Sequence, residues 1–130
     1  MRISLGPVGH FSLAVTDPER SAKFWSTNFD LKELFRFEDG IAVSNDAITI
    51  ALFKGKADPQ VMEHMSFHVE NMRELRAALE ELRRNGVTLE DPGDEIGPEA
   101  PGSPHMGLWF HDPDGYRWEL SVQNGAGEGG

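Results

Sequence analysis

Two histidines and one glutamate stand where this 130-residue chain repeats itself. His10 opens the segment HFSLAV, and His64 opens the similar segment HMSFHV 54 residues later. Glu119 lies in an apolar segment, where a buried carboxylate without a partner is costly. A metal ion bound by the three side chains would satisfy it. The alternative is that both histidines are structural residues held by hydrogen bonds within the sheets. Glu119 would then pair with Arg117, which shares its strand face.

Two helices and seven strands must position these residues. The pattern predicts helices over Asp17–Phe29 and Asn71–Asn85, each with a capping residue at its start, and Gly86 as a left-handed end to the second. Trp25 and Trp118 are expected to pack between helix and sheet rather than to bind a ligand. Strands are expected at His10–Val15, Leu34–Glu38, Ile41–Ser44, Ala47–Phe53, His64–Val69, Met106–His111 and Tyr116–Val122.

The order strand, helix, strands occurs twice along the chain. The ending Asp46–Leu52 also matches Asp114–Leu120, at an offset of 68, so that Ala51 aligns with Glu119. We therefore expect an α+β fold of two βαβββ modules that form an incomplete barrel with a cleft. The expected organisation is one domain over residues 1–124, with modules at about 6–56 and 60–123, a long loop at 90–104 and a flexible tail at 125–130.

The composition argues against several classes of function. The net charge of −10 argues against a nucleic-acid partner, and no apolar run is long enough to cross a membrane. There is no cysteine, which excludes disulfides and thiol nucleophiles and fits a cytoplasmic location. No apolar segment follows the first Arg, so no signal peptide is expected. Exposed sheet edges predict a homodimer.

The paired modules, the H-x-S-x-x-V-x-D/N openings and the ending FHDPDGYRWEL resemble the vicinal oxygen chelate superfamily over residues 8–122. That group includes glyoxalase I, extradiol dioxygenases, fosfomycin-resistance transferases and bleomycin-binding proteins. The resemblance implies the glyoxalase/bleomycin resistance/dioxygenase fold and a homodimer. It also implies a divalent metal (Fe²⁺, Mn²⁺, Zn²⁺ or Ni²⁺) on His10, His64 and Glu119.

Ala51 departs from the pattern of glyoxalase I, which has a metal-binding glutamate at the matching position, so glyoxalase I activity is not expected. The first hypothesis for function is a metalloenzyme that binds a substrate with vicinal oxygens, of a dioxygenase, lyase or transferase type. The second is a metal-independent protein that sequesters a drug or metabolite, as the bleomycin-binding relatives do.

Further residues are expected around the metal. His68 and His105 are candidate acid–base groups. The expected pocket is lined by Ser12, Ser66, Ala51, Met106, Leu108, Phe110 and Arg117, with the apolar members placed on the Glu119 face by hairpin pairing. His111 and Trp109 are expected to point away from Glu119, and His111 to be structural.

Overall fold

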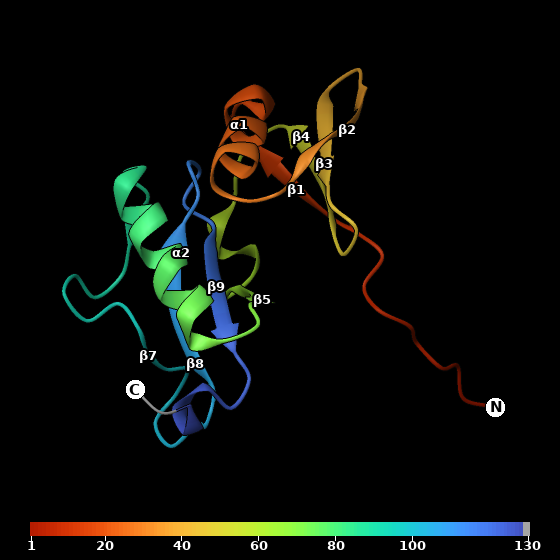
Figure 1. Cartoon of the computed structure of the whole chain (residues 1–130). Helices are drawn as coiled ribbons and strands as arrows, with labels where there is room; N and C mark the ends of the chain where they lie inside the picture. The colour runs from red at the N-terminus through yellow and green to blue at the C-terminus, as the bar shows by residue number, and fades with distance from the viewer. Residues whose placement is uncertain (129–130) are drawn as a thin grey trace. The chain divides into compact units, whose positions relative to one another are not determined.

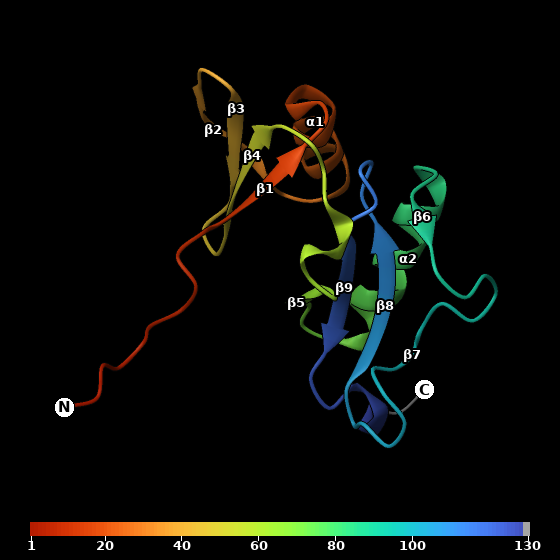
Figure 2. The same cartoon turned by 180° about the vertical axis from the view of Figure 1, so that it is seen from behind.

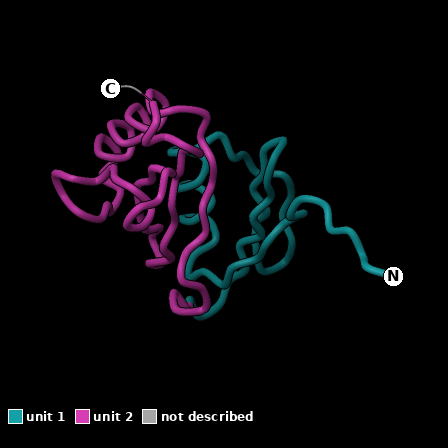
Figure 3. Tube along the Cα trace, turned by 90° about the horizontal axis from the view of Figure 1, so that it is seen from below, with its two compact units in different colours: residues 1–57 teal, residues 58–130 magenta. Residues whose placement is uncertain are grey.

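The computed structural model describes residues 1–128 of the chain. The chain forms two compact units, Met1–Ala57 and Asp58–Gly130, which Figure 3 shows in different colours. This division falls between the two modules expected from the sequence. Each unit contains a strand, a helix and then further strands, which confirms the expected α+β class and the βαβββ repeat (Figure 1).

The first unit is a four-stranded sheet with one helix. Its elements are β1 (Phe11–Val15), α1 (Pro18–Asn28), β2 (Lys32–Phe37), β3 (Gly40–Ser44) and β4 (Thr49–Lys54). The strand order is β1-β4-β3-β2, with β1 parallel to β4 and the other pairs antiparallel. Residues 1–10 precede β1 and form no helix or strand.

Helix α1 begins where its sequence predicts. The Asp17 carboxylate accepts hydrogen bonds from the backbone N–H groups of Glu19 and Arg20 at 3.1 and 3.3 Å, and Pro18 occupies the first helical position. Trp25 is buried, as expected. The core of this unit also contains the buried strand residues Leu13, Val15, Ile41, Val43, Ile50 and Leu52.

The second unit carries the same order with additional short elements. It contains a 3₁₀ turn, η1 (Pro59–Val61), then β5 (Met65–His68), α2 (Met72–Arg84), β6 (Thr88–Leu89), β7 (Gly97–Pro98), β8 (Met106–His111), β9 (Arg117–Val122) and a second turn, η2 (Gly125–Gly127). The strand order is β5-β9-β8-β6, with β7 pairing a different part of β8. Strands β5 and β9 are parallel, and β8 and β9 are antiparallel.

Helix α2 covers one face of the β8–β9 pair, and Figure 2 shows these strands from the opposite side. The Asn71 side chain caps its first turn, and Gly86 ends it at a φ of +70°, as expected. The helix buries Met72, Leu75, Leu79 and Leu82. Because a helix occupies one face of the sheet, polar side chains of β9 must point to the other.

Two segments are more ordered than the sequence suggested. The predicted loop over residues 90–104 contains β7, and β6 was not predicted because two-residue strands have no periodicity to read. The first residues of the expected flexible tail form η2, where Ala126 N–H donates to the Pro104 carbonyl and the Glu128 carboxylate accepts from Met72 N–H. Residues 129–130 lie outside the described residues. No helix among residues 1–128 is long and apolar enough to cross a membrane.

The hairpin between β8 and β9 corrects part of the expected pocket. Asp112 N–H donates to the Tyr116 carbonyl, and Gly115 lies at a φ of +88°, so three residues form the loop instead of four. The register consequently pairs Trp109 with Glu119. The expected pocket residues Met106, Leu108 and Phe110 therefore lie on the opposite, helix-covered face, and that expectation was wrong. Trp109 and His111 share the Glu119 face, also contrary to expectation.

Candidate metal centre

The second unit buries a carboxylate at the middle of its sheet. Glu119 lies on β9 between β5 and β8, and its side chain is 0% exposed. Among residues 1–128, neither of its carboxylate oxygens has a hydrogen-bond partner. Burial raises the pKa of Glu119 because it disfavours the charged form, and the nearby Glu99 charge raises it further, while the Ser66 hydroxyl and the His64 ring lower it. A buried acceptor without a donor suits a cation or a proton.

The strand register brings His64 to this carboxylate. Ser66 pairs directly with Glu119 in the parallel β5–β9 ladder, and His64 precedes it by two residues and points to the same face. His64 Nε2 lies 3.8 Å from Glu119 Oε1, and the His64 side chain is 32% exposed. The two groups thus present a nitrogen and an oxygen donor side by side, one of them reachable from solvent.

Gly107 makes room for the carboxylate. It lies on β8, and a Cβ atom at that position would collide with Glu119 Oε2 and would be 3.1 Å from Cδ and 3.3 Å from Cγ, closer than ordinary contact. Sequence reasoning missed Gly107. The repeat gives a signal for it, because Gly40 of β3 occupies the matching register position in the first unit.

Arg117 does not neutralise Glu119, so the alternative pairing suggested by the sequence is not present. Its guanidinium makes two hydrogen bonds to Glu90, at 2.7 and 2.9 Å, and a third to Glu63. These bonds hold the pKa of Glu90 below its ordinary value. The Arg117 side chain also lies over the Trp109 ring, 5.3 Å from its centroid.

The two candidate acid–base histidines have partners of their own. His68 Nε2 lies 2.9 Å from the amide nitrogen of Gln123, and His105 Nδ1 accepts a hydrogen bond of 2.9 Å from Asn124 N–H. His111 bonds Glu90 at 2.7 Å, which fits its expected structural part. The catalytic parts of His68 and His105 stay predictions.

A match over most of the sequence shows the family to which the chain belongs. A sequence model of the Glyoxalase/Bleomycin resistance protein/Dioxygenase superfamily matches residues 8–120. The chain belongs to this superfamily. No curated protein matches it.

Solved structures show that the superfamily fold is present. An integron cassette protein from the mobile metagenome of V. cholerae is 21% identical with a TM-score of 0.71, covering 94% of this chain and 98% of its own. The fosfomycin resistance protein FosX from Listeria monocytogenes is 18% identical with a TM-score of 0.72, covering 92% and 94%. A lactoylglutathione lyase from Agrobacterium tumefaciens is 13% identical with a TM-score of 0.73, covering 95% and 98%. At these identities the likeness concerns the fold alone.

Within this superfamily member the two units diverge at one pair of equivalent positions. Ala51 pairs with Ser12 on β1, as Glu119 pairs with Ser66 on β5. The register thus confirms the repeat alignment that matched Ala51 to Glu119. Since alanine has no donor atom, the first unit offers no ligand at this place. His10, the remaining expected ligand, is exposed and immediately precedes β1.

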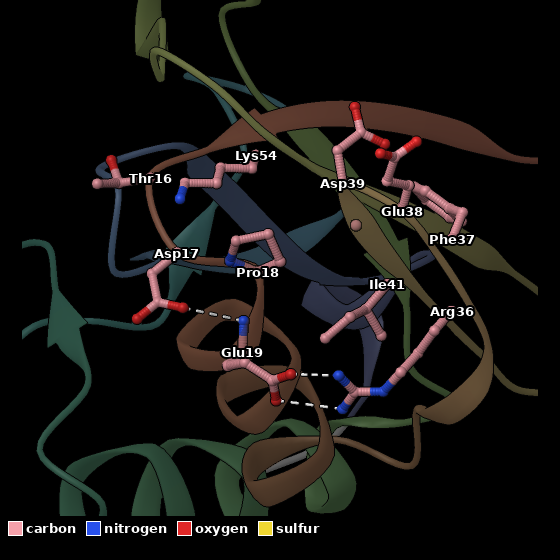
Figure 4. Close-up of a pocket in the computed structure, with 11 residues that line it drawn as sticks. Thr16, Asp17, Pro18, Glu19, Arg36, Phe37, Glu38, Asp39, Ile41 and Lys54 are labelled. Carbon is pink, nitrogen blue, oxygen red and sulfur yellow. Dashed lines mark hydrogen bonds and ion pairs between the residues drawn. The ribbon is translucent and has the colours of Figure 1, made fainter.

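The first unit also has a hollow of about 520 Å³ between the start of α1 and the β2–β3 turn (Figure 4). Three of its six charged residues are paired: Glu19 binds Arg36, and Asp17 caps α1. The hollow contains no histidine. Its chemistry therefore resembles an ordinary charged surface more than a reaction site.

The residues of the second unit fit a metal ion in part. Residues 1–128 contain no group of three or more His, Asp or Glu side chains already arranged to hold one. They do contain the His64–Glu119 pair, whose carboxylate has no other partner. An imidazole nitrogen and a carboxylate oxygen are ligands that manganese, iron, zinc and nickel accept. The pair supplies two of the three expected donors.

Proposed function

We propose that this chain is a metal-dependent enzyme that acts on a small molecule with two adjacent oxygen atoms. The observation that carries the proposal is the buried Glu119 carboxylate, which has no hydrogen-bond partner among residues 1–128 and lies 3.8 Å from His64 Nε2. An unpaired carboxylate in this position costs free energy of folding unless a cation or a proton binds it. Membership of the superfamily supports the cation.

His64 and Glu119 would hold the ion, and His10 is the proposed third ligand because the repeat aligns it with His64. A divalent ion at this place would act as a Lewis acid on substrate oxygens. Three protein ligands leave coordination positions open, and Ala51 adds no fourth donor. Two adjacent substrate oxygens would occupy these open positions. Ser66 lies directly beside Glu119 and can donate a hydrogen bond to it.

Metal binding tests the proposal directly. The protein is purified without chelators, analysed for elements, stripped, and titrated by calorimetry with Mn²⁺, Zn²⁺, Ni²⁺ and, without oxygen, Fe²⁺. We expect about one ion per chain. His64→Ala and Glu119→Gln should each raise the dissociation constant of the metal by more than the roughly 10–100-fold that loss of an outer-sphere partner causes.

His68→Ala is the matched control, since His68 ends β5 on the same face as His64, which precedes that strand, but its Nε2 lies beside the Gln123 amide. It should retain the metal, and His10→Ala should not. Failure of the wild-type protein to bind any of the four ions would refute the metalloenzyme. Tight binding of an organic cation by that metal-free protein would then favour the sequestering function.

A further inference from the structure

A carboxylate outside the proposed ligand set faces the far side of the His64 ring. Glu63 Oε1 lies 3.5 Å from His64 Nδ1, a buried nitrogen that has no hydrogen-bond partner among residues 1–128, whereas His64 Nε2 faces Glu119. The imidazole thus stands between two carboxylates, one at each ring nitrogen. A neutral imidazole carries one proton, and an acceptor placed beside one ring nitrogen favours the proton there and leaves the other nitrogen with a free electron pair.

Glu63 is 78% exposed and would not hold a fixed position alone. Arg117 supplies the restraint, because its guanidinium donates to the same Oε1 atom that faces His64. Arg117 is itself held by two hydrogen bonds to Glu90.

A second contact fixes the plane of the imidazole. The Trp109 ring meets His64 edge to face, with centroids 6.4 Å apart and planes at 74°. Arg117 lies over that indole, so one guanidinium restrains both the carboxylate and the aromatic ring that touch His64.

We propose that Glu63, held by Arg117, is a positioning residue that keeps the proton of neutral His64 on Nδ1 and leaves Nε2 free to bind beside Glu119. Carboxylates commonly set metal-binding histidines in this way. The part of the proposal that concerns the metal rests on the proposed function. The part that concerns the proton does not, because it describes the metal-free protein.

The test is the tautomer of His64, measured by long-range ¹H–¹⁵N NMR on metal-free protein at a pH where the ring is neutral. Wild type should show the Nδ1–H form. Glu63→Ala should shift His64 toward the Nε2–H form that neutral histidine favours in water. Glu63→Gln should restore Nδ1–H, because Arg117 still selects an oxygen at the Oε1 position.

Two further variants separate positioning from general structure. Arg117→Gln should move the tautomer in the same direction as Glu63→Ala, and Glu70→Ala, an exposed carboxylate just after β5, should leave it unchanged. In metal titrations Glu63→Ala should raise the dissociation constant by about 10-fold, the lower end for an outer-sphere carboxylate.

An unchanged tautomer in Glu63→Ala would overturn the proposal. So would an Nε2–H tautomer in the wild-type protein. If wild type binds no metal but shows the Nδ1–H form, and Glu63→Ala loses it, the positioning stands and only the proposed function fails.

Discussion

Replacing Gly107 by alanine perturbs the candidate centre without touching any proposed ligand. The new Cβ atom would lie 3.1 Å from Glu119 Cδ and 3.3 Å from Cγ. Ordinary carbon contacts lie at about 3.5–4.0 Å, so the carboxylate must retreat by roughly 0.5–1 Å. It cannot do so freely, because Glu119 is fully buried between two neighbouring strands.

The expected loss of stability follows from two opposing effects. Overpacking a well-filled site costs about 1–3 kcal/mol, and removing a glycine from the unfolded chain returns about 0.4–1 kcal/mol. The net loss should be about 1–2 kcal/mol, or a fall in Tm of roughly 4–8 °C for a chain of this size. Metal affinity should fall as well, since coordination distances tolerate shifts of only about 0.2 Å.

Thermal unfolding and metal titration measure the two effects. Gly97→Ala is the matched control, because Gly97 pairs directly with Gly107 but a Cβ there meets nothing within 4 Å. It should change stability by less than about 0.5 kcal/mol. In a Glu119→Ala background, Gly107→Ala should also cost less than about 0.5 kcal/mol, because the obstructing carboxylate is gone.

If Gly107→Ala lowered the free energy of unfolding equally with and without the Glu119 carboxylate, the predicted clash between the two residues would be refuted. That result would place the cost in the β8 backbone and not in the contact between the two residues. Unchanged metal affinity in Gly107→Ala would show that the position of the carboxylate does not govern binding.

Three other outcomes are expected. Because the pKa of Glu119 is raised in the folded protein, the stability that its protonated form provides is present below about pH 4.5 and is lost as the pH rises through the folded-state pKa. Metal-free Glu119→Gln should therefore be more stable to urea than wild type at pH 8 and equally stable at pH 4. A stability difference that does not depend on pH would contradict this. Ala51→Glu should weaken calorimetric binding of a catechol or hydroxamate to the metal-loaded protein and keep or raise metal affinity, and equal chelator affinity would show that position 51 does not face the metal. Light scattering should give twice the chain mass of 14.5 kDa, and the single-chain mass at micromolar concentration would exclude the homodimer.

Local signals in the sequence predicted much of the fold. Asp17 and Asn71 mark helix starts because their side chains accept backbone N–H groups within the same turn, and Gly86 marks an end because it adopts a positive φ. The repeat that aligned Ala51 with Glu119 is also present in the strand register of both sheets. These features depend on neighbours a few residues apart or on a strand order that occurs twice.

The surroundings of Glu119 depended on contacts that sequence patterns do not specify. One residue more or less in the β8–β9 turn reverses which face each β8 side chain occupies, so Trp109 and not Leu108 came to lie beside the carboxylate. The partners of Arg117 are Glu63 and Glu90, which lie 54 and 27 positions away.

The sequence by itself therefore determined the two helices, the longer strands, the repeat and the superfamily. Tertiary structure decided that Glu119 has no hydrogen-bond partner among residues 1–128, because the nearby guanidinium already has two carboxylates to bind. A charged group can pair with any opposite charge that folding brings within reach, and the residue spacing along one strand identifies only one of these partners.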